Sequence, residues 1–208
     1  MVCRKHGNPV PSEFRLVCAE CLLENPPTGI YDSPWVVIGN LSRLEKDRAK
    51  PSDNEIRELI LTSYHKNDIF ADKKRNVVVV GGTFEVPIEE NGLDALARKT
   101  GITGGKWLIR EMEEGINRSW YVIANSTWKD ELGNEAKAST ARRAGTSNEY
   151  VICVYTENYL EALELKRVRE RLRTLGYAQR LYYKPDLYTY LNIYHKTFPN
   201  FRASRYAD

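Results

Sequence analysis

The first residues whose types and spacing suggest chemistry are four potential metal ligands near the start of the chain. Cys3-x2-His6 is followed, after eleven intervening residues, by Cys18-x2-Cys21. Each pair lets a tight turn present two side chains to one ion, and two such turns complete a tetrahedron of thiolate and imidazole ligands, which suits zinc. Because the protein fills all four positions, the predicted zinc is structural rather than catalytic. The alternative is four unrelated ligand-type residues near a chain end.

We expect residues 1–28 to form a zinc-binding knuckle and residues 29–208 to form a second, α+β domain. Few apolar side chains are available in the first unit, so metal binding would supply most of its folding free energy, on the order of 10 kcal/mol. The segment Pro-Pro-Thr-Gly at residues 26–29 is typical of a stiff linker between the two units.

The residue patterns that mark common enzyme classes are missing from the sequence. It contains no Gly-x-Ser-x-Gly elbow, no His-Glu-x-x-His helix and no Walker loop. Cys153 lies inside the apolar run VICVY, where a thiol is typically an inert core residue. We therefore expect a protein that is not an enzyme. A hydrolase or transferase with an unrecognised site is the remaining alternative.

Composition places the chain among ordinary globular proteins. Of its 208 residues, 42% are hydrophobic and 28% are charged, and the net charge is +3, which by itself does not demand a nucleic-acid partner. No run of about 18 apolar residues is present, so we expect no membrane span. The polar start MVCRKHGNPVP lacks the apolar centre of a signal peptide, so we expect a protein of the cytoplasm or nucleus.

Hydrophobic periodicity predicts an α+β protein whose central stretch, residues 104–156, contains strand, helix, strand, hairpin loop and strand. Thr156 and Gly176 are predicted to begin and end a further helix over residues 159–175. The full set of predicted strands covers residues 35–39, 76–80, 84–86, 106–110, 136–141, 150–155 and 180–183. The predicted helices cover residues 53–66, 116–132 and 159–175, with a helical turn at 93–99 inside a long loop and a short element at 187–194.

A basic cluster lies on the last of these helices. Between Lys166 and Arg173 there are five basic residues and one acidic residue. One interpretation is a cationic face exposed to solvent, and the other is a contact with phosphate or with an acidic partner.

The central stretch also resembles a known fold. Its strand entry GGKWL, its aromatic-containing helix, its hairpin with a basic loop and its strand VICVYT are similar to the core of translation initiation factor 4E, which binds the mRNA cap. With VICVYTENY and LYYKPDLYTYLNIY, residues 104–195 resemble the basophilic leukemia expressed protein (BLES) family, which shares the 4E-like fold. The resemblance implies a curved antiparallel sheet with about three helices on its convex face.

Residues of the 4E ligand site can be compared with this chain one by one. In factor 4E two tryptophans sandwich the methylated guanine and a glutamate pairs with its edge, but the positions matching the second tryptophan and the glutamate are Leu96 and Ala97. Ordinary methylated-cap recognition is therefore not expected. The part of the site that holds the phosphates of the cap in factor 4E has matching basic residues in this chain. Arg142 and Arg143 fall in the matching hairpin loop, and Lys137 lies on the strand before it. The alternative is a basic loop in contact with solvent only.

These patterns leave two functional hypotheses of similar weight. The first is a non-enzymatic protein that binds RNA or a phosphate-bearing nucleotide end through a basic concave surface containing Lys137, Arg142 and Arg143. The second is a protein-interaction adaptor of an RNA-related complex, in which the cap-like pocket has degenerated. The expected cofactor in both cases is one structural zinc ion.

Overall fold

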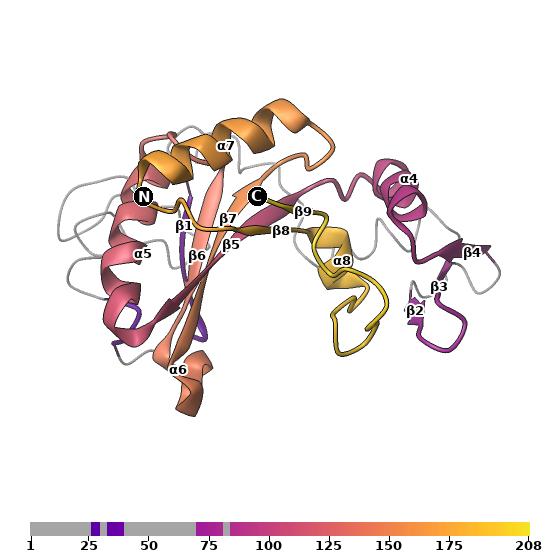
Figure 1. Ribbon diagram of the computed structural model, residues 1–208, viewed down its shortest axis with the longest axis horizontal. Coiled ribbons are helices and arrows are strands. Elements are labelled where there is room, and N and C mark those ends of the chain that lie inside the picture. The colour runs from indigo at the N-terminus through magenta and orange to yellow at the C-terminus, as the bar shows by residue number, and fades with distance from the viewer. Residues whose placement is uncertain (1–25, 30–32, 40–69, 81–83) are drawn as a thin grey trace.

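The computed structural model describes residues 26–29, 33–39, 70–80 and 84–208. Within these ranges the chain forms one six-stranded sheet, one three-stranded sheet and five α-helices (Figure 1). Neighbouring strands are antiparallel in both sheets. The predicted α+β class with an antiparallel sheet is therefore confirmed for this part of the chain.

The six-stranded sheet is built around the predicted central strands. In spatial order its strands are β1 (Trp35–Gly39), β6 (Glu135–Ser139), β7 (Glu149–Thr156), β5 (Gly105–Met112), β8 (Tyr182–Pro185) and β9 (Tyr206–Ala207). The two longest strands, β5 and β7, lie next to each other at the centre. A Cβ atom at Gly133 would overlap the backbone carbonyl oxygen of Tyr155, so the chain entering β6 can approach β7 this closely only with glycine at that position.

Two helices, α5 (Glu113–Trp128) and α7 (Ala162–Thr174), supply the apolar side chains that pack on one face of this sheet. Trp120 of α5 is completely buried, as are Ile109 of β5 and Ile152 of β7. Burial of each such side chain contributes about 1.5–3 kcal/mol, so this layer carries much of the stability of the fold. The core side chains on this face include Val36, Ile38, Trp107, Ile109, Ala136, Ala138, Ile152, Val154, Ile116, Trp120, Ile123, Leu165, Val168 and Leu172.

Helix α7 ends where it was predicted to end but begins later. Gly176 has the left-handed φ of 103° that follows a helix C-terminus, as predicted. Thr156, the predicted N-cap, instead remains in β7, and its hydroxyl shares a hydrogen bond of 2.6 Å with the hydroxyl of Tyr183. The helix begins at Ala162, because the intervening residues form turns that connect β7 to it.

The three-stranded sheet consists of β2 (Phe70–Asp72), β3 (Val77–Val80) and β4 (Phe84–Pro87), which confirms the predicted pairing of the second and third of these segments. A complete helix, α4 (Glu90–Thr100), follows where only one helical turn within a loop was predicted. Arg205 joins α4 to the last part of the chain, because its guanidinium donates to Glu90 Oε2 at 2.7 Å and to Asp94 Oδ2 at 3.1 Å.

Two predictions fall outside the described residues. These are the zinc ligands Cys3, His6, Cys18 and Cys21, and the helix over residues 53–66. Among the residues that are described, no group of three or more His, Cys, Asp and Glu side chains is placed to hold a metal ion. None of the described helices combines the length and apolar character that crossing a bilayer requires.

Candidate functional site

The second face of the six-stranded sheet carries lysines and aromatic rings instead of a continuous apolar layer. Because side chains alternate along a strand, the neighbours of the buried Trp107 and Ile109 on β5 point to the opposite face. Lys106 of β5 is paired across the sheet with Tyr155 of β7 and with Lys184 of β8, which places all three on that face. We call it the cation–aromatic face and define it by Trp35, Lys137, Tyr155, Lys106 and Lys184.

Cations and rings alternate across this face. The Lys137 Nζ atom lies 4.5 Å from the centre of the Trp35 ring and 5.2 Å from that of Tyr155. The Lys106 Nζ atom lies 5.1 Å from the centre of the Tyr155 ring. At the other end, the Arg143 guanidinium carbon lies 4.4 Å from the centre of the Trp35 ring. These distances are within the range of cation–π attraction, so the series holds its long side chains in place without neutralising their charge.

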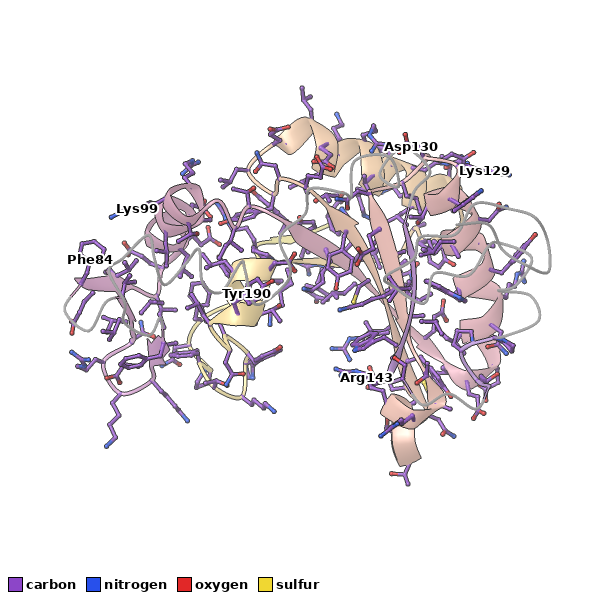
Figure 2. All side chains as sticks on the ribbon, turned by 180° about the vertical axis from the view of Figure 1, so that it is seen from behind. Phe84, Lys99, Lys129, Asp130, Arg143 and Tyr190 are labelled. Carbon is purple, nitrogen blue, oxygen red and sulfur yellow. The ribbon has the colours of Figure 1, made fainter. Side chains whose placement is uncertain are left out.

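The series draws its residues from five elements of the fold, and β5 supplies Lys106. Trp35 comes from the edge strand β1, Lys137 from β6 and Tyr155 from β7. Arg143 comes from α6 (Ala141–Ala144), a single helical turn between β6 and β7. Figure 2 shows Arg143 where α6 meets the end of the sheet. The antiparallel pairing of β1 with β6, which sets Val37 opposite Lys137, brings Trp35 within reach of both cations.

Two carboxylates, Glu135 opposite Tyr155 and Asp186 beside Lys106, lie near the three ammonium groups of Lys106, Lys137 and Lys184. Lys106 forms an ion pair with Asp186, the first residue of α8 (Asp186–Tyr190). Burial, together with the neighbouring charge of Lys106, lowers the pKa of Lys184 to about 8. Burial also lowers the pKa of Lys137, again with a contribution from Lys106. An anion placed beside these ammonium groups would oppose both effects.

Lys184 is the most enclosed cation of the face. The residue is only 5% exposed, its Nζ atom donates a hydrogen bond of 2.8 Å to the carbonyl oxygen of Ile193, and the same atom lies 3.4 Å from the centre of the Tyr194 ring. The carbonyl dipole and the ring partly replace the water that this ammonium group has lost. The turn that follows α8 therefore encloses one end of the face.

The structure brings together two of the three residues predicted to bind phosphate. Lys137 and Arg143 both contact the Trp35 ring. Arg142 is exposed on the same short helix as Arg143. The predicted loop over residues 142–148 instead contains α6 and the 3-10 turn η2 (Gly145–Ser147), because backbone N–H groups at residues 143 and 144 bond back to the carbonyl oxygen of Thr140.

Sequence reasoning missed the remaining members of the face. It assigned Trp35, Tyr155 and Lys106 to strands but gave them no role in a site. The available signal was the two-residue period of a strand, which turns Lys106 and Tyr155 away from the core, but Leu108 and Cys153 share that face and weaken the pattern. Lys184 offered no such signal, because its burial depends on the turn at residues 193–194.

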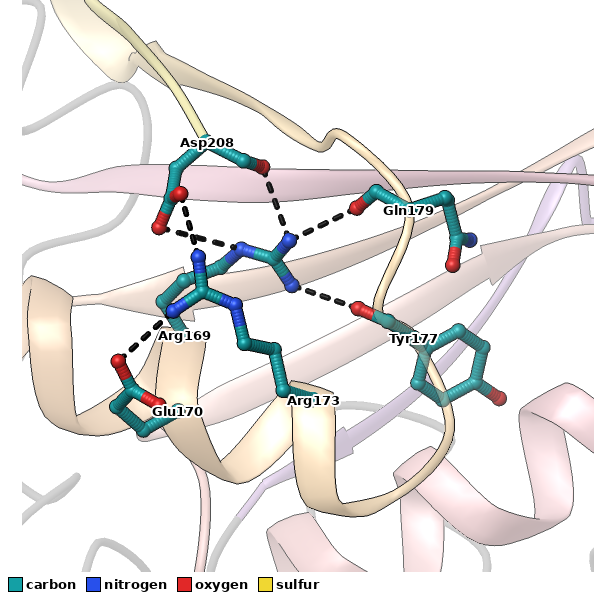
Figure 3. Close-up of polar contacts among 6 residues, drawn as sticks. All are labelled: Arg169, Glu170, Arg173, Tyr177, Gln179 and Asp208. Atoms are coloured by element: carbon teal, nitrogen blue, oxygen red, sulfur yellow. Dashed lines mark hydrogen bonds and ion pairs between the residues drawn. The ribbon is translucent and has the colours of Figure 1, made fainter.

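The arginines of α7 bind other parts of the same chain, which neither interpretation included (Figure 3), whereas Lys166 and Arg167 are exposed, in line with a cationic face in contact with solvent. Arg169 is 2% exposed and donates to the carbonyl oxygens of Tyr177, Gln179 and Asp208 at 2.7–2.9 Å. Arg173 forms ion pairs with Glu170 and with Asp208. Arg167 and Arg171 bind the segment that follows α5, through the carbonyl oxygen of Leu132 at 2.9 Å and the carboxylate of Glu131 at 2.5 Å. These four arginines therefore hold separate segments of the chain together, and we call them the α7 clamp.

The residues that replace the cap-binding pair of factor 4E belong to the core. Leu96 and Ala97 lie on α4 and are 3% and 0% exposed. Cys153 is also buried, and burial raises the pKa of its thiol, which disfavours the reactive thiolate. These three side chains offer no ligand contact and no nucleophile at the surface.

The fold and this face define an α+β protein with one helix-covered face and one cation–aromatic face on its principal sheet. The model of the family described as basophilic leukemia-expressed protein Bles03 matches residues 86–192, just over half of the chain. The chain therefore belongs to the Bles03 family, as its sequence resemblance implied. The matched range contains Lys106, Lys137, Arg143, Tyr155 and Lys184, whereas Trp35 precedes it.

Proposed function

We propose that this chain is a non-enzymatic protein that binds RNA or a phosphate-bearing nucleotide end on the cation–aromatic face. The observation that carries the proposal is the series Arg143, Trp35, Lys137, Tyr155 and Lys106, in which cations and rings alternate across neighbouring strands. Nucleic-acid ligands combine phosphate charges with flat rings, and this face offers a partner for each.

Electrostatics favours an anionic ligand over a neutral one. Burial lowers the pKa of both Lys137 and Lys184, and repulsion from Lys106 contributes to both shifts. A phosphate group that approaches these ammonium groups gains their attraction and reduces the mutual repulsion. Trp35 and Tyr155, both partly exposed, supply surfaces against which a base can stack.

The proposal does not include ordinary recognition of a methylated cap. That recognition needs a second stacking ring and a carboxylate, and the matching residues Leu96 and Ala97 are buried and aliphatic. The likeness to the factor 4E fold and the structural zinc ion at residues 3–21 remain parts of the proposal that rest on the sequence.

Binding of a fluorescein-labelled hexauridylate, measured by anisotropy at several salt concentrations, tests the proposal. For a single strand, log Kobs should fall against log[salt] by about 0.7 per phosphate contact. Lys137→Ala and Arg143→Ala should each make this slope shallower by about 0.7. Lys166→Ala is the matched control, because Lys166 is exposed on α7, on the other side of the sheet, and its removal should leave the slope unchanged.

Two results would contradict the proposal. One is an absence of binding at low salt by protein whose circular dichroism shows it to be folded. The other is binding whose salt dependence responds to Lys166→Ala as strongly as to Lys137→Ala, which would indicate attraction by overall charge instead of by this face.

The alternative function, a protein-interaction adaptor, is favoured by one observation on the helical side. Leu163 in the first turn of α7 is 86% exposed, so a partner that docks on the helical side would bury it. Capture of a partner by the parent chain that Leu163→Ser abolishes and Lys137→Ala preserves would support this alternative over nucleotide binding.

A further inference from the structure

The cation–aromatic face extends beyond the residues that a single nucleotide would occupy. Tyr182 of β8 is paired with Leu108 of β5, two positions from the pair Lys106–Lys184, and therefore points to the same face. Tyr182 is 44% exposed and Tyr194, whose ring covers Lys184, is 37% exposed. Rings and cations thus continue across the sheet from β1 as far as β8.

The length of this path follows from the strand order. From β1 to β8 the order β1-β6-β7-β5-β8 contains four strand spacings, or ~19 Å at about 4.8 Å each. One strand of a duplex advances about 3.4 Å per nucleotide, and an extended single strand advances farther. The path from Trp35 to Tyr182 therefore corresponds to a run of between about three and six nucleotides.

A single strand fits this arrangement better than a mononucleotide or a duplex. Trp35 and Tyr155 lie on β1 and β7, with Lys137 between them on β6, so ring and charge repeat along a line that crosses the strands. A mononucleotide would use one ring and its adjacent cation and leave the rest without a ligand. A duplex hides the faces of its bases inside its own stack and cannot use the rings.

We infer that the ligand of this face is a single-stranded run of three or more nucleotides that crosses the sheet from Trp35 on β1 to Tyr182 and Tyr194 at β8. This inference rests on the proposed function and specifies its substrate class. The backbone phosphates contact Arg143 and Lys137, the buried ammonium groups of Lys106 and Lys184 attract the strand from beneath the surface, and bases stack on the exposed rings. The contacts described here are made with charge and ring surface, so the strand is bound with little preference for sequence.

Competition against the labelled hexauridylate measures the length of the path. The competitors are uridine monophosphate and unlabelled oligouridylates of three, six and twelve nucleotides. Each base that gains a ring should strengthen binding at least about fivefold, so affinity should rise steeply from one nucleotide to six and then level off. Tyr182→Ala and Tyr194→Ala should weaken the hexamer about fivefold or more and leave the monophosphate unchanged.

Tyr121→Ala is the matched control, because Tyr121 is an exposed tyrosine on α5, which packs on the opposite face, and its loss should change neither affinity. If the monophosphate competes as well as the hexamer, the single-strand inference is wrong while nucleotide binding stands. If the length dependence survives both Tyr182→Ala and Tyr194→Ala, the strand does not cross β8 and the inference is likewise wrong. If the labelled hexamer does not bind at all, the proposed function itself fails.

Discussion

Replacing Arg169 with methionine should destabilise the protein by about 3 kcal/mol, although the substitution keeps the length and apolar stem of the side chain. The guanidinium of Arg169 donates at 2.7 Å to the carbonyl oxygen of Tyr177 and at 2.8 Å to that of Gln179. A third acceptor, the carbonyl oxygen of Asp208, also receives the N–H of Leu181, so it keeps a partner after the substitution. The loss therefore falls on two acceptors, each worth about 1–3 kcal/mol when left without a donor.

Urea denaturation of the parent and of Arg169→Met gives the free energies to be compared. Arg110→Met is the matched control, because Arg110 is paired with Glu149 on the surface with 71% of its side chain exposed, and such pairs contribute at most about 1 kcal/mol. Hydrogen exchange should locate the effect, with faster exchange at Leu181 and Asp208, whose amides pair β8 with the last residues. Equal losses in the two variants, or a loss below about 1 kcal/mol for Arg169→Met, would refute the clamp assigned to Arg169.

Two further predictions concern metal and pH. Purified protein should contain one zinc ion per chain, held by Cys3, His6, Cys18 and Cys21. A double variant with Cys18→Ser and Cys21→Ser should lose this zinc ion. A zinc content of the parent protein far below one ion per chain would refute the site. The pKa of Lys184 in the folded protein is about 8, below the ordinary value of 10.5. Between pH 8 and pH 10.5 the folded state therefore binds fewer protons at this group than the unfolded state does. The free energy of unfolding consequently increases as the pH rises through this range. The stability of the parent relative to Lys184→Met should therefore improve across that window by about 3 kcal/mol, and a difference independent of pH would show that burial of Lys184 does not lower its pKa.

Local sequence determined most of the elements of the described fold. The β-branched and apolar runs at residues 35–39, 106–110 and 150–155 form strands, and the 3.6-residue pattern around Trp120 and Ile123 forms a helix. At α4 only a helical turn over residues 93–99 was predicted within a long loop, although Leu93, Leu96 and Ala97 share a buried helical stripe. Boundaries shifted by a few residues, because the ends of elements depend on neighbours that a local pattern does not contain.

The site was only partly predictable for a related reason. The resemblance to factor 4E directed attention to Lys137, Arg142 and Arg143, and two of these meet at Trp35. The same reasoning treated the basic residues of α7 as one exposed cluster. Whether an arginine is exposed or clamps a backbone depends on which carbonyl groups the fold brings to it, and the acceptors of Arg169 lie as far away in sequence as Asp208.

By itself, the sequence determined the class of the fold, the identity of the strands and the family to which the chain belongs, because these follow from periodicities and motifs within a few tens of residues. Only the tertiary structure decided which charged side chains bind other parts of the same chain and which lie on the cation–aromatic face. Antiparallel pairing of three strands set Lys106 beside Lys184 and Tyr155. Packing of α7 turned Arg169 inward. Both outcomes depend on how segments far apart in the sequence pack against each other. A short pattern of neighbouring residues does not contain that information.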